Sequence, residues 1–292
     1  MSNALALSFT RTDEGRAARR QLRKRVTSAG LTTLTYVIAL VVFFPLFWTV
    51  LTGFKTEAQA VAQPPVIFFH GTLSNYSEVL NGGYSGFFWN SVIISISATL
   101  LALLLGLPAA FSLAFYPTKN SPRVLSWVLS TRMLPVVGAL IPLIIISKRA
   151  GLFDSRLGMI LIYAAVNVPL VIWMMRSFFA DMPRDILEAS LVDGASFLQL
   201  MRRIILPLSL PGLASTALLA LIFTWNEFLL AVNLTAVNAS TLPVFISGFM
   251  TSEGLFWAKM SAASTLAIAP VIIAGWLAQR SLVRGLTFGA VK

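Results

Sequence analysis

The sequence predicts an all-α membrane protein with six transmembrane helices. Of its 292 residues, 57% are hydrophobic and only 11% are charged, and the mean hydropathy is +0.81. A soluble domain is nearer half apolar and a quarter charged. A helix needs about 20 apolar residues to cross a bilayer core of about 30 Å. The apolar runs that are long enough cover residues 31–53, 88–115, 125–146, 157–178, 212–234 and 260–282.

The first apolar run is predicted to be a retained transmembrane helix. It is too long for the hydrophobic region of a signal peptide, and no small-residue cleavage site follows it. Residues 1–30 then form a basic N-terminal arm, which is either a short surface helix or disordered. We take residues 31–282 as the transmembrane domain and residues 283–292 as a C-terminal tail.

Several of the apolar runs contain proline within them. Proline is tolerated in a membrane helix where neighbouring helices satisfy the backbone groups that it frees. We therefore expect kinked helices around a cavity. The prolines in question are Pro108, Pro135, Pro142, Pro169 and Pro270.

The distribution of Lys and Arg predicts that both termini are cytoplasmic. With the N-terminus inside, inner segments carry 16 basic residues and outer segments carry five, and basic residues concentrate on the cytoplasmic side of a membrane protein. The formal net charge of +11 is thus explained by topology and by contact with lipid, and we expect no nucleic-acid partner. Two longer outer loops, residues 54–86 and 235–259, are either contact surfaces or segments that pack on the helix ends.

The cytoplasmic loop at residues 179–211 is predicted to form a helix, a sharp turn and a second helix. Asp181 can cap the first helix, with Pro183 in its first turn. Gly194 can end it, because glycine adopts the left-handed conformation without steric cost. Ser196 and Gln199 have the spacing of a capping box at the start of the second helix, which continues to about residue 206.

Apolar side chains occur on this loop although it should face water. Exposed apolar surface on a rigid element is typical of a partner site, and a helix that docks in a groove is a recurrent form of recognition. The alternative is that these side chains pack only against the inner helix ends of the same chain. The residues concerned are Leu187, Leu191, Phe197 and Leu200.

The sequence excludes several kinds of active site. It has no Cys and a single histidine, His70, so we expect no disulfide, no metal cluster and no nucleophilic triad. A phosphate-binding loop of the G-x-x-x-x-G-K-[ST] type is absent, since residues 53–56 (Gly-Phe-Lys-Thr) lack the required spacing. The chain is therefore not expected to be an enzyme or to bind ATP by that route.

Polar side chains within the fifth and fourth runs are candidates for a substrate pathway. Glu227 lies roughly 22 Å from the inner end of its run if that run is one helix, and an ionisable side chain at such depth should face a cavity or a partner. Trp225 and Asn226 adjoin it, and Asn167 lies near the centre of the fourth run. An indole can stack on a sugar face, and a carboxylate and amides can bond sugar hydroxyls. The alternative is that Glu227 bonds a neighbouring helix.

Arg132 lies within the third run. Its depth differs from that of Glu227 by roughly 10 Å, so a direct ion pair is not expected. Its side chain can extend toward the inner surface or bond the carbonyl groups freed near Pro135.

A family resemblance rests on the cytoplasmic loop. Residues 188–194 read Glu-Ala-Ser-Leu-Val-Asp-Gly, and after nine further residues comes Ile-Ile-Leu-Pro at 204–207. This pattern resembles the EAA motif of ABC importer permeases, with Ser190 at a position where the family often has Ala.

Other segments resemble particular members of that family. Residues 224–227, 241–243 and 284–292 are similar to the second permease of carbohydrate importers, the type of the smaller maltose permease. Residues 130–135 and 254–259 are similar to permeases for polyols such as mannitol and sorbitol.

The resemblance implies a type I ABC importer permease fold in the bacterial cytoplasmic (inner) membrane. It implies a second homologous permease, two cytoplasmic ATPase subunits that bind ATP and Mg, and an extracytoplasmic binding protein that delivers a sugar or polyol. In such systems the larger permease supplies most sugar contacts. The residues expected to couple this chain to the ATPase are Glu188, Ala189, Ser190, Asp193 and Gly194, with Leu187, Leu191 and Phe197 as the gripping face.

An ion-coupled secondary transporter is the alternative from another functional class. It would use Glu227 and Arg132 as coupling groups and need no partner. Such transporters usually show inverted repeats with broken helices at matching positions, and the sequence shows no such symmetry. A membrane-embedded enzyme is the third alternative, and it lacks a catalytic constellation.

Overall fold

The computed structural model describes residues 2–251 and 254–287. For residues 2–24, 26, 184, 191, 197, 255 and 280–287 this description covers the backbone only. The chain divides into two compact units, Met1–Thr52 and Gly53–Lys292.

The first unit is the greater part of one long helix, α1 (Ser2–Gly53). Its apolar part, Thr27–Gly53, is long enough to cross a membrane and contains Pro45. Thr49 Oγ1 donates to the carbonyl oxygen of Pro45 at 2.9 Å. The predicted first span is thus helical, and the basic arm continues the same helix.

The second unit consists of helices and one short hairpin. Its strands, β1 and β2, pair antiparallel. Two segments, η1 and η2, are π-helical turns. The elements are α2 (Glu57–Ala60), α3 (Ser74–Val79), η1 (Leu80–Tyr84), α4 (Ser85–Phe115), α5 (Ser121–Met133), α6 (Val136–Arg149), α7 (Arg156–Ala180), α8 (Arg184–Val192), α9 (Phe197–Leu200), η2 (Met201–Ile205), α10 (Leu206–Leu208), α11 (Leu210–Trp225), α12 (Leu229–Leu234), α13 (Leu242–Ser247), β1 (Met250–Thr251), β2 (Gly254–Leu255) and α14 (Trp257–Thr287).

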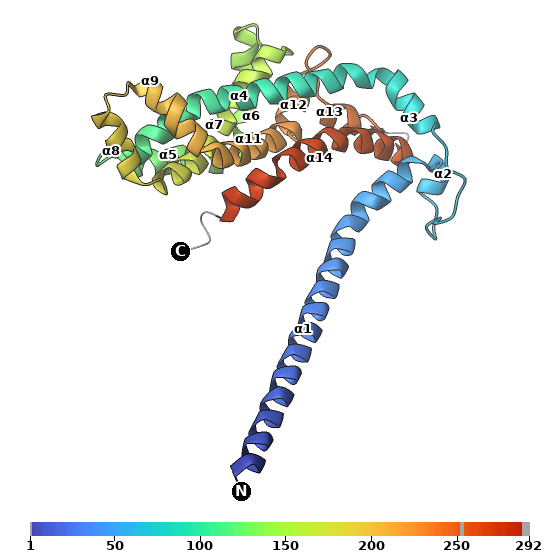
Figure 1. Ribbon diagram of the computed structural model, residues 1–292. Coiled ribbons are helices and arrows are strands. Elements are labelled where there is room, and N and C mark those ends of the chain that lie inside the picture. Colours follow the sequence, from blue (N-terminus) through green and yellow to red (C-terminus); the bar gives the residue numbers. More distant parts are fainter. Residues whose placement is uncertain (1, 252–253, 288–292) are drawn as a thin grey trace. The chain divides into compact units, whose positions relative to one another are not determined.

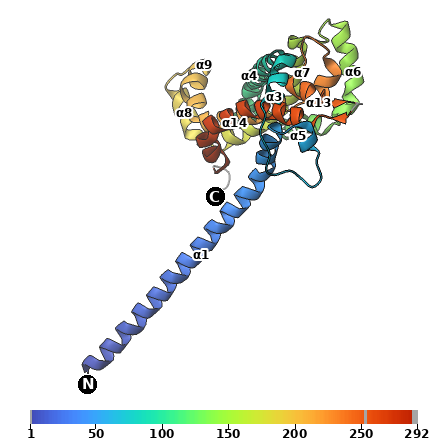
Figure 2. The same cartoon turned by 90° about the vertical axis from the view of Figure 1, so that its right-hand side faces the viewer.

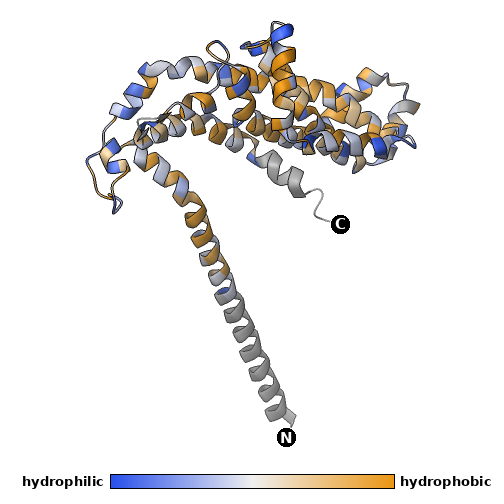
Figure 3. Ribbon diagram, turned by 180° about the vertical axis from the view of Figure 1, so that it is seen from behind, coloured by the Kyte–Doolittle hydropathy of each residue, from blue (hydrophilic) through white to orange (hydrophobic). Residues whose placement is uncertain are grey.

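Four helices in the described part of the chain are long and apolar enough to span a membrane. Besides α1, these spans are Ser74–Phe115, Arg156–Ala180 and Trp257–Gln279. Two bent helix pairs, α5 with α6 and Leu198–Leu208 with α11, bring the number to six if each pair is one span. Hydrophobic residues run along these helices, with hydrophilic residues mostly at helix ends and in loops (Figure 3).

The third predicted run is not a continuous helix, which corrects the expectation for residues 125–146. Helices α5 and α6 meet at 88°. Leu134 between them is extended, with φ −65° and ψ 128°, because the residue before a proline is disfavoured in the helical conformation. Pro135 also lacks the N–H that would continue the helix.

The fifth predicted run, residues 212–234, is also broken. Helix α11 ends at Trp225, and Asn226 adopts φ −90° and ψ 0°. Helix α12 starts only at Leu229. Glu227 therefore lies in the break, and its predicted depth on one continuous helix was wrong.

The core forms where α4 and α7 lie side by side along much of their length (Figures 1 and 2). Gly106 permits this approach, since a Cβ there would lie 2.6 Å from Cγ1 of Val171. Small buried side chains continue the same face of α4 at Ala98, Ala102 and Ala110. Helix α11 packs against α4, α7 and α14, which places its C-terminal break between these helices.

Candidate functional site

The predicted turn at Gly194 is confirmed. Helix α8 ends at Val192, and Gly194 has a φ of +75°, in the left-handed region that glycine adopts at helix ends. The N–H of Ala195 donates to the carbonyl oxygen of Ser190 at 3.0 Å, a bond that satisfies a terminal carbonyl of α8. We call residues 188–194 the elbow.

The predicted capping box after the elbow is confirmed. The N–H of Ser196 donates to Gln199 Oε1 at 2.9 Å, and the N–H of Gln199 donates to Ser196 Oγ at 3.4 Å. The N-cap expected at Asp181 was wrong. Asp181 instead follows the last turn of α7, where its N–H donates to the carbonyl oxygen of Ser177 at 3.3 Å.

The apolar residues of this loop are divided between the core and the surface. Leu187 and Leu200 are 7% and 1% exposed and belong to the core of the same unit, so the expectation that they face water was wrong. They fall on the inward stripe of an amphipathic segment. Val192 and Leu198 are 88% and 61% exposed.

The other loop residues that were predicted to couple to the ATPase also divide between buried and exposed positions. Ser190 is buried, and its Oγ donates to the carbonyl oxygen of Leu187 at 2.7 Å. Glu188, Ala189 and Asp193 are exposed. The side chains of Leu191 and Phe197, predicted to belong to the gripping face, lie outside the described part of the structure.

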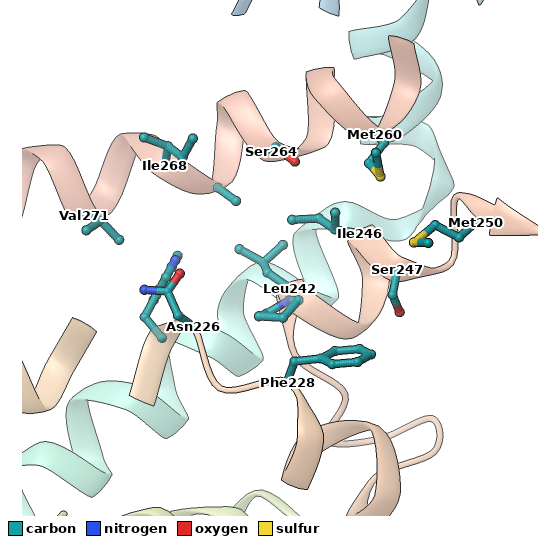
Figure 4. Close-up of a pocket in the computed structure, with 13 residues that line it drawn as sticks. Asn226, Phe228, Leu242, Ile246, Ser247, Met250, Met260, Ser264, Ile268 and Val271 are labelled. Atoms are coloured by element: carbon teal, nitrogen blue, oxygen red, sulfur yellow. The ribbon is translucent and has the colours of Figure 1, made fainter. Parts of the chain in front are cut away.

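A cavity of about 510 Å³ lies beside the break between α11 and α12. Trp225, Asn226 and Phe228 line it from the break, and residues of α13 and α14 with Met250 of β1 line the rest. In Figure 4 the Asn226 side chain lies on the side of the cavity opposite α14. Ser247 and Ser264 add hydroxyl groups to this mainly apolar wall. Ligand sites commonly combine a mostly apolar lining with a few polar groups in this way.

Glu227 does not line this cavity, although it follows Asn226 directly. Its Oε2 accepts a hydrogen bond of 2.8 Å from Tyr163 Oη on α7. Its oxygens also accept from the N–H of Leu230 at 2.9 Å and of Ala231 at 3.1 Å. These N–H groups are free donors in the first turn of α12. Glu227 thus caps α12 and links it to α7 by a hydrogen bond. This arrangement matches the alternative in which Glu227 bonds a neighbouring helix.

Asn167 belongs to the same network rather than to the cavity. It is 3% exposed, and its Nδ2 donates to the carbonyl oxygen of Tyr163 at 2.9 Å and to Thr224 Oγ1 at 3.2 Å. Of the four residues predicted for the pathway, Trp225 and Asn226 meet at the cavity. Asn167 and Glu227 join α7 to α11 and α12.

Arg132 and Glu227 form no ion pair among the described residues. The Arg132 guanidinium lies over the Phe223 ring, 4.9 Å from its centroid. Its Nη1 is buried and has no hydrogen-bond partner in the described part of the chain.

Sequence reasoning missed a cage of hydrogen bonds around Asp154, in the turn between α6 and α7. The Asp154 carboxylate accepts bonds from backbone N–H groups at Ala236 (2.8 Å), Val237 (3.1 Å), Asn238 (3.1 Å) and Ala239 (3.1 Å). Asn238 Nδ2 adds another of 2.9 Å. We call Asp154 with residues 236–239 the clamp.

The clamp favours the charged form of its carboxyl group. Burial raises the pKa of Asp154, but hydrogen bonds from the four backbone N–H groups outweigh it and lower the pKa to about 2. Asp154 itself has a φ of +51°, a conformation that Asp tolerates better than most residues.

Helix α4 holds the next residues of the same loop. Asn90 Nδ2 donates to the carbonyl oxygens of Asn238 at 3.0 Å and Ser240 at 2.9 Å, and Arg156 Nε donates to Asn90 Oδ1 at 2.7 Å. The N–H of Leu242, a residue that lines the cavity, donates to Ser91 Oγ at 2.8 Å. The polar pair Asn90-Ser91 in an apolar run was the available sequence signal.

The loop at residues 54–86 also packs on a helix end. Glu57 accepts hydrogen bonds from the N–H groups of Ala258 (2.9 Å) and Lys259 (3.0 Å) at the start of α14. Lys259 Nζ pairs with Glu78 Oε2 at 2.7 Å. For both long loops, packing on helix ends therefore accounts for much of the polar pattern. Within the described residues no three His, Cys, Asp or Glu side chains gather as a metal site.

Comparison with known proteins identifies the family. A family model described as the binding-protein-dependent transport system inner membrane component matches residues 15–287. The probable ABC transporter permease y4oR of Sinorhizobium fredii is 36% identical, over 92% of this chain and 97% of that protein. The trehalose transport permease SugB of Mycobacterium tuberculosis is 34% identical, over 92% and 98%.

Solved structures agree on the fold. A chain of a bacterial ABC transporter for alginate import superposes with a TM-score of 0.70 at 24% identity, covering 88% of this chain and 97% of that one. The MetNI methionine ABC transporter gives 0.57 at 20% identity, with coverage of 72% and 97%. The chain therefore belongs to the family of binding-protein-dependent transport system inner membrane components, and it is a multi-pass inner-membrane permease with the type I importer fold.

Proposed function

We propose that this permease serves an ATP-dependent importer of a sugar or polyol. It forms half of the translocation pathway and pairs with a second homologous permease. Two cytoplasmic ATPase subunits bind ATP and Mg, and an extracytoplasmic binding protein delivers the substrate. The chain itself then needs no cofactor and performs no catalysis.

Relatives support the substrate class. SugB is a trehalose permease, and the trehalose/maltose permease MalG of Thermococcus litoralis is 32% identical over 88% of this chain and 94% of that protein. The sulfoquinovosyl glycerol permease SmoH of Agrobacterium fabrum is 33% identical over 85% and 88%. The narrower choice of a polyol rests on the resemblance of residues 130–135 and 254–259 to polyol permeases.

The elbow is the single observation that carries the coupling role. Its left-handed Gly194 separates helix α8 from a second, capped helix, so that the bend is fixed by local bonds. Exposed Glu188, Asp193 and Val192 project from it. The exposed polar and apolar residues at the tip of this helix pair suit insertion in a cleft of an ATPase subunit. A movement of that subunit on ATP binding would then reach α11 through the π-helical turn η2.

Trp225 and Asn226 are the candidates for substrate contact. They line the cavity of about 510 Å³, where an indole can stack on a sugar face and an amide can bond hydroxyls. Met250 and Met260 give this wall an adaptable, apolar surface. Glu227 and Asn167 do not line the cavity, but their hydrogen bonds stabilise the break between α11 and α12 beside which the cavity lies.

The alternative of an ion-coupled transporter requires the Glu227 carboxylate to be available to a coupling ion. Glu227 is used by Tyr163 and the first turn of α12, and it makes no ion pair with Arg132 in the described structure. Membership of a binding-protein-dependent family also favours an ATP-driven mechanism.

The test is uptake by proteoliposomes that contain both permeases, the ATPase subunits and the binding protein. Radiolabelled mannitol, sorbitol, trehalose and maltose are offered with ATP inside. We expect uptake of at least one of them, unaffected by a proton uncoupler and abolished by a catalytically dead ATPase. Uptake that persists with the dead ATPase, or that stops with the uncoupler, would contradict the proposal.

A further inference from the structure

Arg132 lies at a bend with a cavity beside it. It belongs to the last turn of α5, directly before the 88° bend into α6. A cavity of about 370 Å³ adjoins the bend and is lined by residues of α5, α6, α7 and α12. Thr131 and Arg132 supply its polar side chains, and the rest of the lining is apolar. This cavity is distinct in its lining from the one beside Trp225 and Asn226.

The guanidinium of Arg132 has unused hydrogen-bonding capacity. Nη1 is buried and has no partner within the described residues. A buried donor without an acceptor is costly, so it is rare in native proteins unless a ligand or partner supplies the acceptor. The carboxylate of Glu227 already accepts bonds from Tyr163, Leu230 and Ala231.

Arg132 has an aromatic face beside it and makes no ion pair within the described part of the chain. The Phe223 ring lies under the guanidinium at 4.9 Å, and a desolvated cation is stabilised by an aromatic face. This contact compensates part of the positive charge and leaves the in-plane N–H groups available. Those groups form a planar fork that fits two neighbouring oxygens.

Thr131 supplies the complementary acceptor. Its Oγ1 donates its hydrogen to the carbonyl oxygen of Val128 at 2.6 Å, which leaves the hydroxyl oxygen free to accept. A hydroxyl group both accepts and donates a hydrogen bond. One substrate hydroxyl can therefore accept from Arg132 while it or its neighbour donates to Thr131.

We propose that Arg132 and Thr131 bind two adjacent hydroxyl groups of the polyol or sugar as it passes the bend, and that Arg132 thereby sets substrate specificity. The inference rests on the proposed function. An anionic lipid headgroup and a carboxylate of the second permease are the competing acceptors, and the experiment separates them.

The experiment compares substrates and variants in proteoliposomes of the complete importer. Whichever of mannitol, sorbitol, trehalose and maltose is taken up is compared with its forms that lack a single hydroxyl group. In the wild type we expect uptake of the intact substrate to exceed that of at least one deoxy form by about tenfold or more, as expected for a site built to bond a hydroxyl. In Arg132→Met this ratio should fall several-fold, toward the value that the binding protein alone sets. Arg132→Lys should retain part of the wild-type ratio, because the ammonium keeps the charge but loses the fork.

The ratio of uptake of the intact substrate to uptake of its deoxy form does not change when a variant merely reduces the amount of folded permease. The binding protein is the same in every sample, and a misfolded permease lowers the uptake of all substrates equally. Arg123→Met is the matched control, since Arg123 lies exposed near the start of the same helix, and its ratio should equal that of the wild type.

Each other outcome overturns the inference. An unchanged ratio in Arg132→Met would show that Arg132 does not bind substrate hydroxyls. Loss of the second permease from purified Arg132→Met complexes, with the ratio intact, would assign the acceptor to that subunit. If anionic lipid changes the uptake rate of the wild type but not that of Arg132→Met, again with the ratio intact, that result would assign the acceptor to a lipid headgroup. No uptake of any sugar or polyol by the wild type would instead overturn the proposed function, and this inference with it.

Discussion

The elbow and the clamp both fix a loop between helices, but they do so with bonds of very different range. Directly after the elbow, Ser196 and Gln199 bond each other across three positions, and Gly194 makes the turn within it. At the clamp, Asp154 bonds backbone groups that lie 82 to 85 positions away. The clamp therefore joins parts of the tertiary structure, whereas the elbow is set by its own sequence. Damage to the clamp should reduce stability, and damage to the elbow should reduce coupling.

Removal of the clamp carboxylate should have the largest effect on stability. Asp154→Ala leaves the N–H groups of residues 236–239 without their acceptor, and hydrogen bonds to charged groups contribute about 1.5–3 kcal/mol each. Because these bonds share one carboxylate, we expect a total loss of about 3 kcal/mol rather than their sum. Thermal unfolding of the purified protein in detergent measures it.

The control for this variant is in the elbow. Asp193→Ala removes an exposed carboxylate and should change stability by less than about 0.5 kcal/mol. Equal losses in the two variants would contradict the distinction between clamp and elbow.

The clamp should also give the protein a specific dependence on acid. The pKa of Asp154 falls from 3.8 to about 2 in the folded state, so the folded protein binds this proton more weakly than the unfolded chain does. Because the carboxylate is partly open to solvent, which screens its charge, we expect the shift to contribute about 1 kcal/mol of stability. It is fully present above pH 3.8 and is lost as the pH falls toward 2. The melting temperature of wild type minus that of Asp154→Asn, followed from pH 7 to pH 2.5, should therefore shrink. A difference that stays constant would refute the assignment.

Glu227 should behave as a link between helices. Glu227→Gln weakens the bonds to Tyr163 Oη and to the first turn of α12 and should cost about 1–2 kcal/mol. A double-mutant cycle with Tyr163→Phe should give a coupling energy of about 1 kcal/mol in thermal unfolding. Additive effects would show that the bond of 2.8 Å between these side chains contributes nothing.

Loss of the cap beside the elbow should have a small effect. Ser196→Ala removes the acceptor for the N–H of Gln199, and such caps contribute about 1 kcal/mol. Because the cap is local, we expect faster hydrogen exchange in α9 alone, with the global melting temperature almost unchanged. Exchange that rises throughout α7 and α11 would mean that the elbow is not independent.

The separation along the sequence between bonded residues also explains which features the sequence could predict. The Gly194 turn and the Ser196–Gln199 box follow from residues that are neighbours in sequence, and both are confirmed. The length of the apolar runs located four of the spans. The break at Glu227 carries no proline or glycine, since residues 225–228 read Trp-Asn-Glu-Phe, and the Glu227 side chain there bonds Tyr163, a residue distant in sequence. Sequence reasoning therefore placed Glu227 on a continuous helix.

Burial was the other quantity that local pattern did not predict. Leu187 was assigned to a surface because its loop is polar, yet it packs in the core. Asp154 gave no signal in the sequence, because its partners belong to a loop that only the fold brings near.

The elbow offers the most direct test of the account. Gly194 adopts a φ of +75° with no atom near an added Cβ, so Gly194→Val strains the backbone by about 1–2 kcal/mol without a steric clash. Gly194→Asn is the matched control, because Asn tolerates this conformation. In proteoliposomes of the complete importer, the number of substrate molecules moved per ATP hydrolysed should fall several-fold in Gly194→Val and stay near the wild-type value in Gly194→Asn. An unchanged ratio in Gly194→Val would contradict the coupling role of the elbow.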